Sequence, residues 1–207
     1  MSKRVCPWWL GYLLASPLRR WSLNPAALLA PHLREGMTVF EPGPGMGFFT
    51  LEMAKLVGQR GRVVAVDLQP KMIERLKRRA LKARVADRID ARLAASDFLG
   101  ISDLAGKVDF TLAYAVVHEM PSASAFFAEA AAASKPGARL LFAEPAGHVT
   151  QQEFDDEMKA ATAAGFRVLE RPSIRKSYAA LLRSAIPGDT LRSAPTALGG
   201  REPGTRA

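Results

Sequence analysis

Hydrophobic runs and amphipathic segments alternate along the chain between residues 37 and 182. Short apolar runs bounded by turn residues predict buried strands, whereas apolar positions that recur every three or four residues predict helices. The strands are expected at residues 37–40, 62–67, 88–93, 108–114, 138–143, 166–171 and 174–182. The helices are expected at residues 48–57, 70–83, 122–134 and 151–164. This alternation is typical of an α/β fold with a doubly wound, mostly parallel seven-stranded sheet and helices on both faces.

Three regions are predicted along the chain. Residues 36–186 carry the alternating pattern and form the main domain. Residues 1–35 form an N-terminal helical cap or lid, with helices expected at residues 8–15 and at residues 25–33 after Asn24-Pro25. Residues 187–207 contain hardly any apolar side chain, so we expect a disordered tail. The apolar stretch of residues 8–18 is too short for a membrane span.

The chain has 207 residues, of which 48% are apolar and 24% are charged, as is usual for a globular protein. Its single cysteine, Cys6, excludes an intrachain disulfide and favours a cytoplasmic location. The net charge is +9, and nine Lys or Arg against three acids fall in residues 71–92. No aromatic residue interrupts this run, which favours the solvated face of a helix over a nucleic-acid site.

A glycine-rich turn between the first predicted strand and helix is the strongest candidate for chemistry. Glu41 ends the strand, and Gly43, Gly45 and Gly47 follow at alternate positions. Glycines let the backbone turn tightly and approach a ligand, and the following helix presents free N–H groups to an anion. A dinucleotide fingerprint would need Gly or Ala at position 48, where this chain has Phe48. The loop therefore predicts a cofactor site that differs from a dinucleotide site.

Two further acids follow predicted strands. Asp67 ends the second strand, 20 residues after Gly47, where doubly wound folds place a carboxylate that binds ribose hydroxyls. The alternative is that Asp67 caps the helix that starts at Pro70, from which it is rather distant. Asp97 and Phe98 follow the third strand, and alone they would be read as turn residues.

The glycine loop, Asp67 and Asp97 together resemble the pattern of class I S-adenosylmethionine-dependent methyltransferases over residues 35–183. The resemblance implies a seven-stranded Rossmann-like fold whose last strand is antiparallel. Residues 116–121 and 135–141 are most similar to the small-molecule branch, which includes enzymes of ubiquinone and menaquinone biosynthesis. The implied function is methyl transfer to a small-molecule acceptor of apolar or aromatic character.

The resemblance also implies S-adenosyl-L-methionine as the cofactor and assigns its contacts. The methionine end would be held by the glycine loop, the ribose by Asp67, the adenine by Leu68, Asp97 and Phe98, and the sulfonium would lie near strand four. The cofactor-binding residues are thus Glu41, Gly43, Pro44, Gly45, Gly47, Asp67, Leu68, Asp97, Phe98, Ala113 and Tyr114.

Candidate catalytic residues follow strands four and five. His118 and His148 lie in these loops, which are neighbours in the implied fold, and ligands bind at such strand ends. They could remove a proton from the acceptor, with Glu119 or Glu144 as an orienting partner. The alternative is that His118 packs at a helix start and His148 is exposed. No motif has the spacing of a metal site, so no metal is expected.

Two other functions remain in view. An RNA or protein methyltransferase would use the basic residues 71–92 to bind its substrate. A non-catalytic protein with the same fold would bind the cofactor without turnover.

Overall fold

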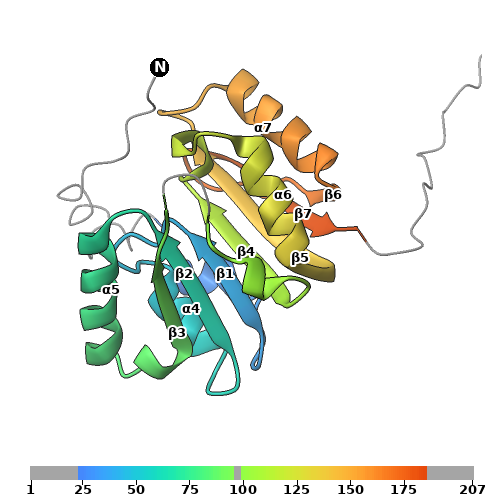
Figure 1. Cartoon of the computed structure of the whole chain (residues 1–207). Helices are drawn as coiled ribbons and strands as arrows, with labels where there is room; N and C mark the ends of the chain where they lie inside the picture. The colour runs from blue at the N-terminus through green and yellow to red at the C-terminus, as the bar shows by residue number, and fades with distance from the viewer. Residues whose placement is uncertain (1–22, 96–98, 186–207) are drawn as a thin grey trace, which may run out of the picture.

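The computed structural model describes residues 23–95 and 99–185, and within them a single sheet organises the molecule (Figure 1). Its seven strands lie in the order β3-β2-β1-β4-β5-β7-β6. β7 runs antiparallel to both β5 and β6, and the other pairs are parallel. The strands are β1 Thr38–Pro42, β2 Arg62–Asp67, β3 Ile89–Leu93, β4 Val108–Tyr114, β5 Ser134–Pro145, β6 Phe166–Glu170 and β7 Ser177–Ser184. The predicted fold class is confirmed.

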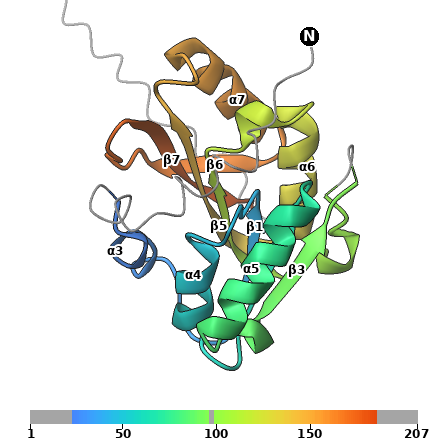
Figure 2. The same ribbon diagram turned by 90° about the vertical axis from the view of Figure 1, so that its left-hand side faces the viewer.

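Helices cover both faces of this sheet (Figures 1 and 2). The α-helices are α3 Pro25–Leu29, α4 Thr50–Leu56, α5 Pro70–Lys82, α6 Ala123–Ala133 and α7 Gln151–Ala163. Three short 3₁₀ turns are η1 Ala86–Arg88, η2 Ser102–Leu104 and η3 Val117–Glu119.

The core has two halves because successive side chains of a strand point to opposite faces. Val39 of β1 packs in the cluster formed with α3, α4 and α5, whereas the next residue, Phe40, packs in the cluster formed with α6 and α7. Leu141 and Phe142 of β5 divide in the same way. Burial on both faces explains why these strands are nearly continuous apolar runs in the sequence.

Strand β5 is longer than the predicted 138–143 segment. It begins at Ser134 and includes Lys135, Pro136 and Gly137, which the sequence suggested would only end the preceding helix. The register to β4 shifts here, since Val108 pairs with Ser134 and Phe110 with Arg139. Such a bulge tolerates proline and glycine, because local ladder hydrogen bonds are already lost.

The predicted strand at residues 174–182 is also corrected. Ile174 and Arg175 belong to the β6–β7 connection, and β7 starts at Ser177 and continues to Ser184. The reason is local: Lys176 adopts a left-handed φ of 56°, which closes a turn and delays the strand.

Two helix ends have the capping residues that their sequences favour. The Asn24 side chain accepts a hydrogen bond from Ala27 N at 3.2 Å, as expected of an N-cap residue. Gly165 follows α7 with a φ of 97°, the conformation that favours glycine after a helix. The helix after Asn24 is shorter than expected and ends at Leu29.

The predicted helix at residues 8–15, Cys6 and the predicted tail at residues 187–207 lie outside the described residues. Among the residues that are described, no helix has the length and apolar character to cross a membrane.

Candidate functional site

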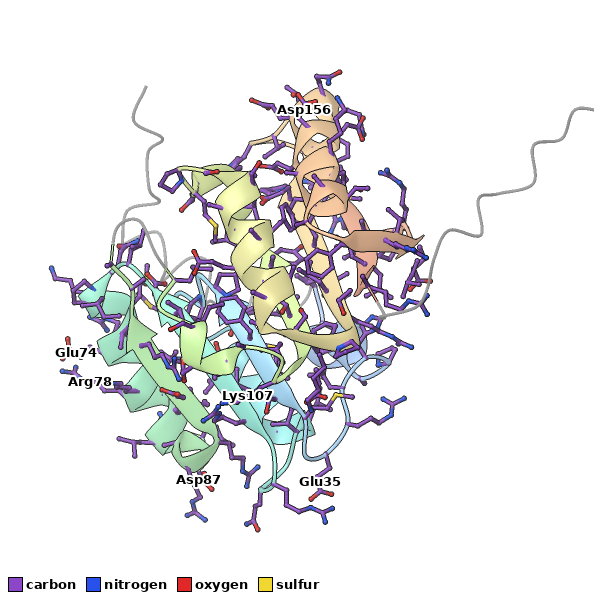
Figure 3. The ribbon with its side chains drawn as sticks, turned by 45° about the vertical axis from the view of Figure 1, so that its right-hand side comes forward. Glu35, Glu74, Arg78, Asp87, Lys107 and Asp156 are labelled. Carbon is purple, nitrogen blue, oxygen red and sulfur yellow. The ribbon has the colours of Figure 1, made fainter. Side chains whose placement is uncertain are left out.

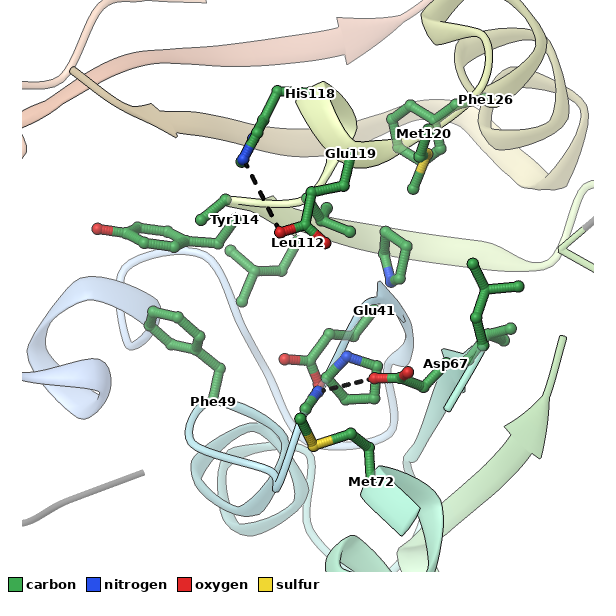
Figure 4. Close-up of a pocket in the computed structure, with 18 of the residues that line it drawn as sticks. Glu41, Phe49, Asp67, Met72, Leu112, Tyr114, His118, Glu119, Met120 and Phe126 are labelled. Carbon is green, nitrogen blue, oxygen red and sulfur yellow. Dashed lines mark hydrogen bonds and ion pairs between the residues drawn. The ribbon is translucent and has the colours of Figure 1, made fainter. Parts of the chain in front are cut away.

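A cavity of about 620 Å³ lies at the carboxyl ends of the central strands (Figure 4). The glycine loop after β1 and the end of β2 line one part of it, and the loops after β4 and β5 line another. In Figure 4, Glu41 and Asp67 lie across the cavity from His118 and Glu119. Parallel strands bring these loops together because their carboxyl ends share one edge of the sheet.

The glycine loop depends on left-handed backbone conformations. Gly43, Gly45 and Gly47 have φ values of 62°, 53° and 83°. A Cβ at Gly43 would lie 2.5 Å from Cγ2 of Val116, so this glycine lets the loop after β4 approach β1. A Cβ at Gly45 would meet no atom within 4 Å, and Gly45 lines the cavity. The loop therefore leaves space for a ligand against its backbone.

Glu41 is a buried carboxylate at the floor of the cavity, with 3% of its surface exposed. Its Oε2 accepts a hydrogen bond of 2.6 Å from the Thr50 hydroxyl at the start of α4. Burial raises the pKa of Glu41 to about 8, against the lowering effect of that hydrogen bond, and the nearby Asp67 charge adds to the rise. A cationic ligand would stabilise the ionised carboxylate.

Asp67 links the glycine loop to the start of α5. Its Oδ2 accepts from Gly45 N at 3.2 Å and its Oδ1 accepts from Gln69 N at 2.8 Å. Gln69 is the N-cap residue of α5, so Asp67 does not occupy the capping position considered for it in the sequence. Burial raises the pKa of Asp67, while the backbone hydrogen bonds oppose that rise. The carboxylate borders the cavity at the end of β2.

A third buried carboxylate, Glu144, lies at the end of β5 and holds the loop after β4. Glu144 has no exposed surface, and its Oε1 accepts from Val117 N at 2.8 Å and His118 N at 3.2 Å. Its Oε2 lies 2.5 Å from Nδ1 of His118. Because a carboxylate accepts hydrogen bonds, Nδ1 carries the hydrogen and Nε2 is the nitrogen available as a base.

Opposing effects act on the pKa of His118. Burial lowers it, whereas the hydrogen bond and charge of Glu144 raise it, and the charges of Glu119 and Glu157 add to the rise. The balance raises the pKa of His118 above its usual value. Nε2 of His118 lies 4.0 Å from Oε1 of Glu119, the contact marked in Figure 4. The imidazole is thus a stronger base than an exposed histidine.

His148 and an aromatic wall complete this part of the cavity. The His148 ring packs edge-on against His118, with ring centroids 5.9 Å apart. The ring centroids of Phe49 and Tyr114 lie 4.8 Å apart, and Figure 4 shows the two rings side by side. The Tyr114 hydroxyl lies 3.3 Å from the Ser177 hydroxyl of β7. An acceptor bound here would meet an aromatic surface beside the histidines.

The cavity brings together most of the residues selected from the sequence. Those that line it are Glu41, Gly43, Pro44, Gly45, Asp67, Leu68, Tyr114, His118, Glu119 and His148. Gly47 and Ala113 are not lining residues: Gly47 packs against Leu76, and Ala113 is buried under α6 and α7 while its neighbour Leu112 lines the cavity. Asp97 and Phe98 lie outside the described residues.

Other lining residues were not selected from the sequence. Phe49, Arg175, Lys176 and Ser177 come from the start of α4 and the β6–β7 hairpin, which carry no motif. Glu144 does not line the cavity, but it holds His118, and the sequence offered it only as one of two partners for a histidine. The available signal was its position, a single acid directly after the apolar run of residues 140–143.

The described side chains suit an S-adenosylmethionine site. Glu41 and Asp67 are buried carboxylates, and the cofactor carries positive charge on its sulfonium and ammonium groups and hydroxyls on its ribose. Gly45 leaves space beside them. Within residues 23–95 and 99–185, no three His, Cys, Asp or Glu side chains are grouped so that they could hold a metal ion.

Solved structures share this fold. A SAM-dependent methyltransferase from Aquifex aeolicus superposes with a TM-score of 0.76 and 23% identity, covering 86% of this chain and 98% of that one. The [4+2]-cyclase SpnF superposes with a TM-score of 0.64 and 14% identity, covering 78% and 80%. At these identities the likeness shows the fold.

Two relatives match by sequence. The arsenite methyltransferase of Halobacterium salinarum is 29% identical over 121 residues, which are 58% of this chain and 30% of the relative. The protein-L-isoaspartate O-methyltransferase of Methanothrix thermoacetophila is 44% identical over 52 residues, 25% of each chain. The chain thus spans less than a third of each relative's length.

The family comparison covers most of the domain. Residues 33–182 match the family described as "Methyltransferase domain". The match includes the glycine loop, Asp67, the loops after β4 and β5, and most of β7. The chain therefore belongs to the class I, S-adenosylmethionine-dependent methyltransferase family.

Proposed function

We propose that this protein transfers the methyl group of S-adenosylmethionine to a small-molecule acceptor of apolar or aromatic character. The observation that carries the proposal is the single cavity that joins the glycine loop to the His118–Glu144 pair. Its size suits a cofactor together with a small molecule. The similarity of residues 116–121 and 135–141 to the small-molecule branch, with its ubiquinone and menaquinone enzymes, also supports it.

Cofactor binding is assigned to the residues around the glycine loop. Glu41 and the loop Gly43-Pro44-Gly45, with Gly47 shaping its last turn, would hold the methionine end. Asp67 would accept hydrogen bonds from the ribose hydroxyls, and Leu68, Asp97 and Phe98 would border the adenine. Tyr114, and Ala113 beside it in β4, would lie near the sulfonium.

His118 would act as the general base. The bound cofactor supplies an already activated methyl group, so the protein must align the acceptor and remove its proton. Glu144 holds Nδ1 of His118 and leaves Nε2 to take the proton. His148, packed against His118, would help to orient the acceptor, and Glu119 would stabilise the protonated imidazole.

Arsenite is a poor candidate for the acceptor despite the named relative. This chain has one cysteine, whereas the arsenite methyltransferases of the small-molecule branch use several thiols. The Phe49–Tyr114 wall instead suits a flat organic molecule.

Calorimetry with S-adenosylhomocysteine tests the cofactor site. We expect wild-type protein to bind it. Asp67→Ala should lose at least about tenfold in affinity, since a hydrogen bond to a charged group contributes about 1.5–3 kcal/mol. Gly45→Arg should lose at least as much, because its side chain would enter the space beside the loop. Matched controls are Asp87→Ala and Gly106→Arg. Asp87 is exposed, Gly106 shares the left-handed φ, at 63°, and neither lines the cavity.

The outcomes separate the assignments. No binding by wild-type protein would contradict the proposed function. Unchanged binding by Asp67→Ala would contradict only the ribose contact. Methyl transfer from radiolabelled S-adenosylmethionine to a panel of acceptors then tests His118→Gln. We expect its turnover rate to fall by about 10²–10⁴-fold, the range typical of losing a general base.

A further inference from the structure

The β6–β7 hairpin brings two cations to the cavity. Arg175 and Lys176 both line it, next to Ser177 and on the same side as His148. They reach it because β7 lies beside β5, whose following loop carries His148. The sheet order places this hairpin beyond β4, away from the β1–β2 side where the glycine loop and Asp67 lie.

The backbone of the hairpin is held in place. Lys176 O accepts a hydrogen bond from Ala146 N at 3.0 Å, which links the hairpin to the loop after β5. Ser177 N donates to Ile174 O at 3.0 Å, and Ile174 is 7% exposed. Lys176 keeps a left-handed φ of 56° although it is not glycine. These contacts fix the points from which both cationic side chains extend.

Neither cation is neutralised within the hairpin's surroundings. Among residues 23–95 and 99–185, no carboxylate forms an ion pair with the side chain of Arg175 or Lys176. Arg92, by contrast, pairs with Asp90 and with Asp103, both at 2.7 Å. The two hairpin cations are therefore available to a ligand.

Charge is divided along the cavity. The buried or half-buried carboxylates Glu41, Asp67 and Glu119 lie at the ends of β1 and β2 and after β4. Arg175 and Lys176 lie at the opposite, β7 end. The acidic part matches a cationic cofactor, and the basic part matches an anion. An anionic acceptor would also be attracted toward the sulfonium.

We infer that the methyl acceptor carries an anionic group, a carboxylate or a phosphate, which Arg175 and Lys176 bind while its apolar part lies along Phe49 and Tyr114. This inference rests on the proposed function, because it names the acceptor class of that same cavity. Arg offers a planar fork for a carboxylate or phosphate, and Lys adds a mobile point charge.

Calorimetry of the protein saturated with S-adenosylhomocysteine tests the inference. The probes are naphthoate, naphthyl phosphate and the neutral analogue naphthamide, at about 0.15 M salt so that distant charges are screened. We expect an anion to bind at least about tenfold more tightly than the amide, and the double variant Arg175→Gln/Lys176→Gln to abolish that preference. The anion that shows the preference distinguishes carboxylate from phosphate.

Two controls keep the test specific. Arg171→Gln changes an exposed cation near the same hairpin that does not line the cavity, and it should retain the preference. Lys176→Gln keeps a side chain with a Cβ at the left-handed position, so it adds no backbone strain that wild type lacks. Affinity for S-adenosylhomocysteine should be unchanged in both variants, which shows that each is folded.

Three results would overturn the inference: no binding of either anion, equal binding of anion and amide, or a preference that survives the double variant. Loss of S-adenosylhomocysteine binding in the double variant would also overturn it, since the hairpin would then serve the cofactor. None of these contradicts methyl transfer, whereas failure of wild-type protein to bind S-adenosylhomocysteine contradicts the proposed function itself.

Discussion

Individual side chains at this site are unusual because two of its carboxylates are almost completely buried. Glu41 and Glu144 have almost no exposed surface, and they accept hydrogen bonds from a hydroxyl, from backbone N–H groups and from a histidine. Burying a carboxylate costs free energy unless hydrogen bonds or charge compensate it. Such groups are typical of sites that bind a ligand.

Glu41 makes the stability of the unliganded protein depend on pH. Its pKa is raised from 4.5 to about 8, so the folded state binds the proton more tightly than the unfolded state. The corresponding stability is present below pH 4.5 and is lost as pH rises through about 8. We expect Glu41→Gln to remove this loss, which is on the order of a few kcal/mol.

Thermal or urea unfolding between pH 5 and pH 9 measures the effect. The control is Glu35→Gln, because Glu35 is exposed near Gly58 and far from the cavity. If wild type and Glu41→Gln lost the same stability over this interval, Glu41 would not carry a raised pKa.

The His118–Glu144 pair predicts a direction in a histidine titration. The pKa of His118 should lie above 6.5 in wild type and fall in Glu144→Gln, because the charge and hydrogen bond that raise it are removed. NMR resolves this readily, since the chain has three histidines, His32, His118 and His148.

Single His→Gln variants assign the three signals, and His32 supplies an internal reference. Burial and the charge of Arg139 lower the pKa of His32, so this histidine should titrate below 6.5. Its pKa should not change in Glu144→Gln. A His118 pKa that does not move in Glu144→Gln would remove Glu144 as its positioning residue.

Connections between elements set the shape of the cavity more than the helices and strands do. The turn from β1 to α4 needs left-handed glycines, and the loop after β4 packs directly on it. Gly43 and Gly106 have nearly the same φ, 62° and 63°, but only Gly43 faces a close neighbour, Val116. Substitutions at these two glycines therefore distinguish the cost of a left-handed backbone from the cost of a steric overlap.

Gly106→Ala should cost about 1–2 kcal/mol, the penalty of a left-handed residue with a Cβ. Gly43→Ala should cost about 1–3 kcal/mol more, because its Cβ would overlap Cγ2 of Val116. Urea unfolding measures both, and Val116→Ala should recover part of the Gly43→Ala loss. Equal losses at the two glycines would show that the contact with Val116 has no steric cost.

The whole molecule carries a net charge of +9, and several cations of its basic segment bind other groups of the same protein. Arg78 pairs with Glu74, and both project from the outer face of α5 (Figure 3). Arg79 donates to Met46 O at 2.5 Å beside the glycine loop, and Arg88 donates to Ala54 O. These contacts support a structural role for residues 71–92.

We therefore expect only weak, sequence-independent binding of RNA, with a Kd of about 10⁻⁶–10⁻⁴ M at physiological salt. Filter binding of poly(U) to wild type and to Lys77→Glu/Lys82→Glu measures it. The charge reversal should weaken this binding and leave S-adenosylhomocysteine affinity unchanged. Nanomolar binding that persists at physiological salt would instead favour an RNA methyltransferase.

Most of the fold could be predicted from the chain itself. Strands buried on both faces are continuous apolar runs, and glycine, proline and capping residues mark their ends, so strand count, layers and helix positions follow from local patterns. The misplaced boundaries, at β5 and β7, lie where a bulge and a left-handed Lys176 interrupt the pattern. Such interruptions depend on the neighbouring strand.

The grouping of Glu41, Gly43, Gly45 and Asp67 at one end of the cavity was also predictable, because they belong to two consecutive strand–loop units with fixed spacing. The other end of the cavity, where we propose that the acceptor binds, was decided by tertiary structure. Residues 49, 118, 148 and 175 come from four separate segments, and only the sheet order β1-β4-β5-β7 brings them to one cavity. Local sequence specifies how a segment folds, whereas the distances between remote side chains arise from how the strands assemble.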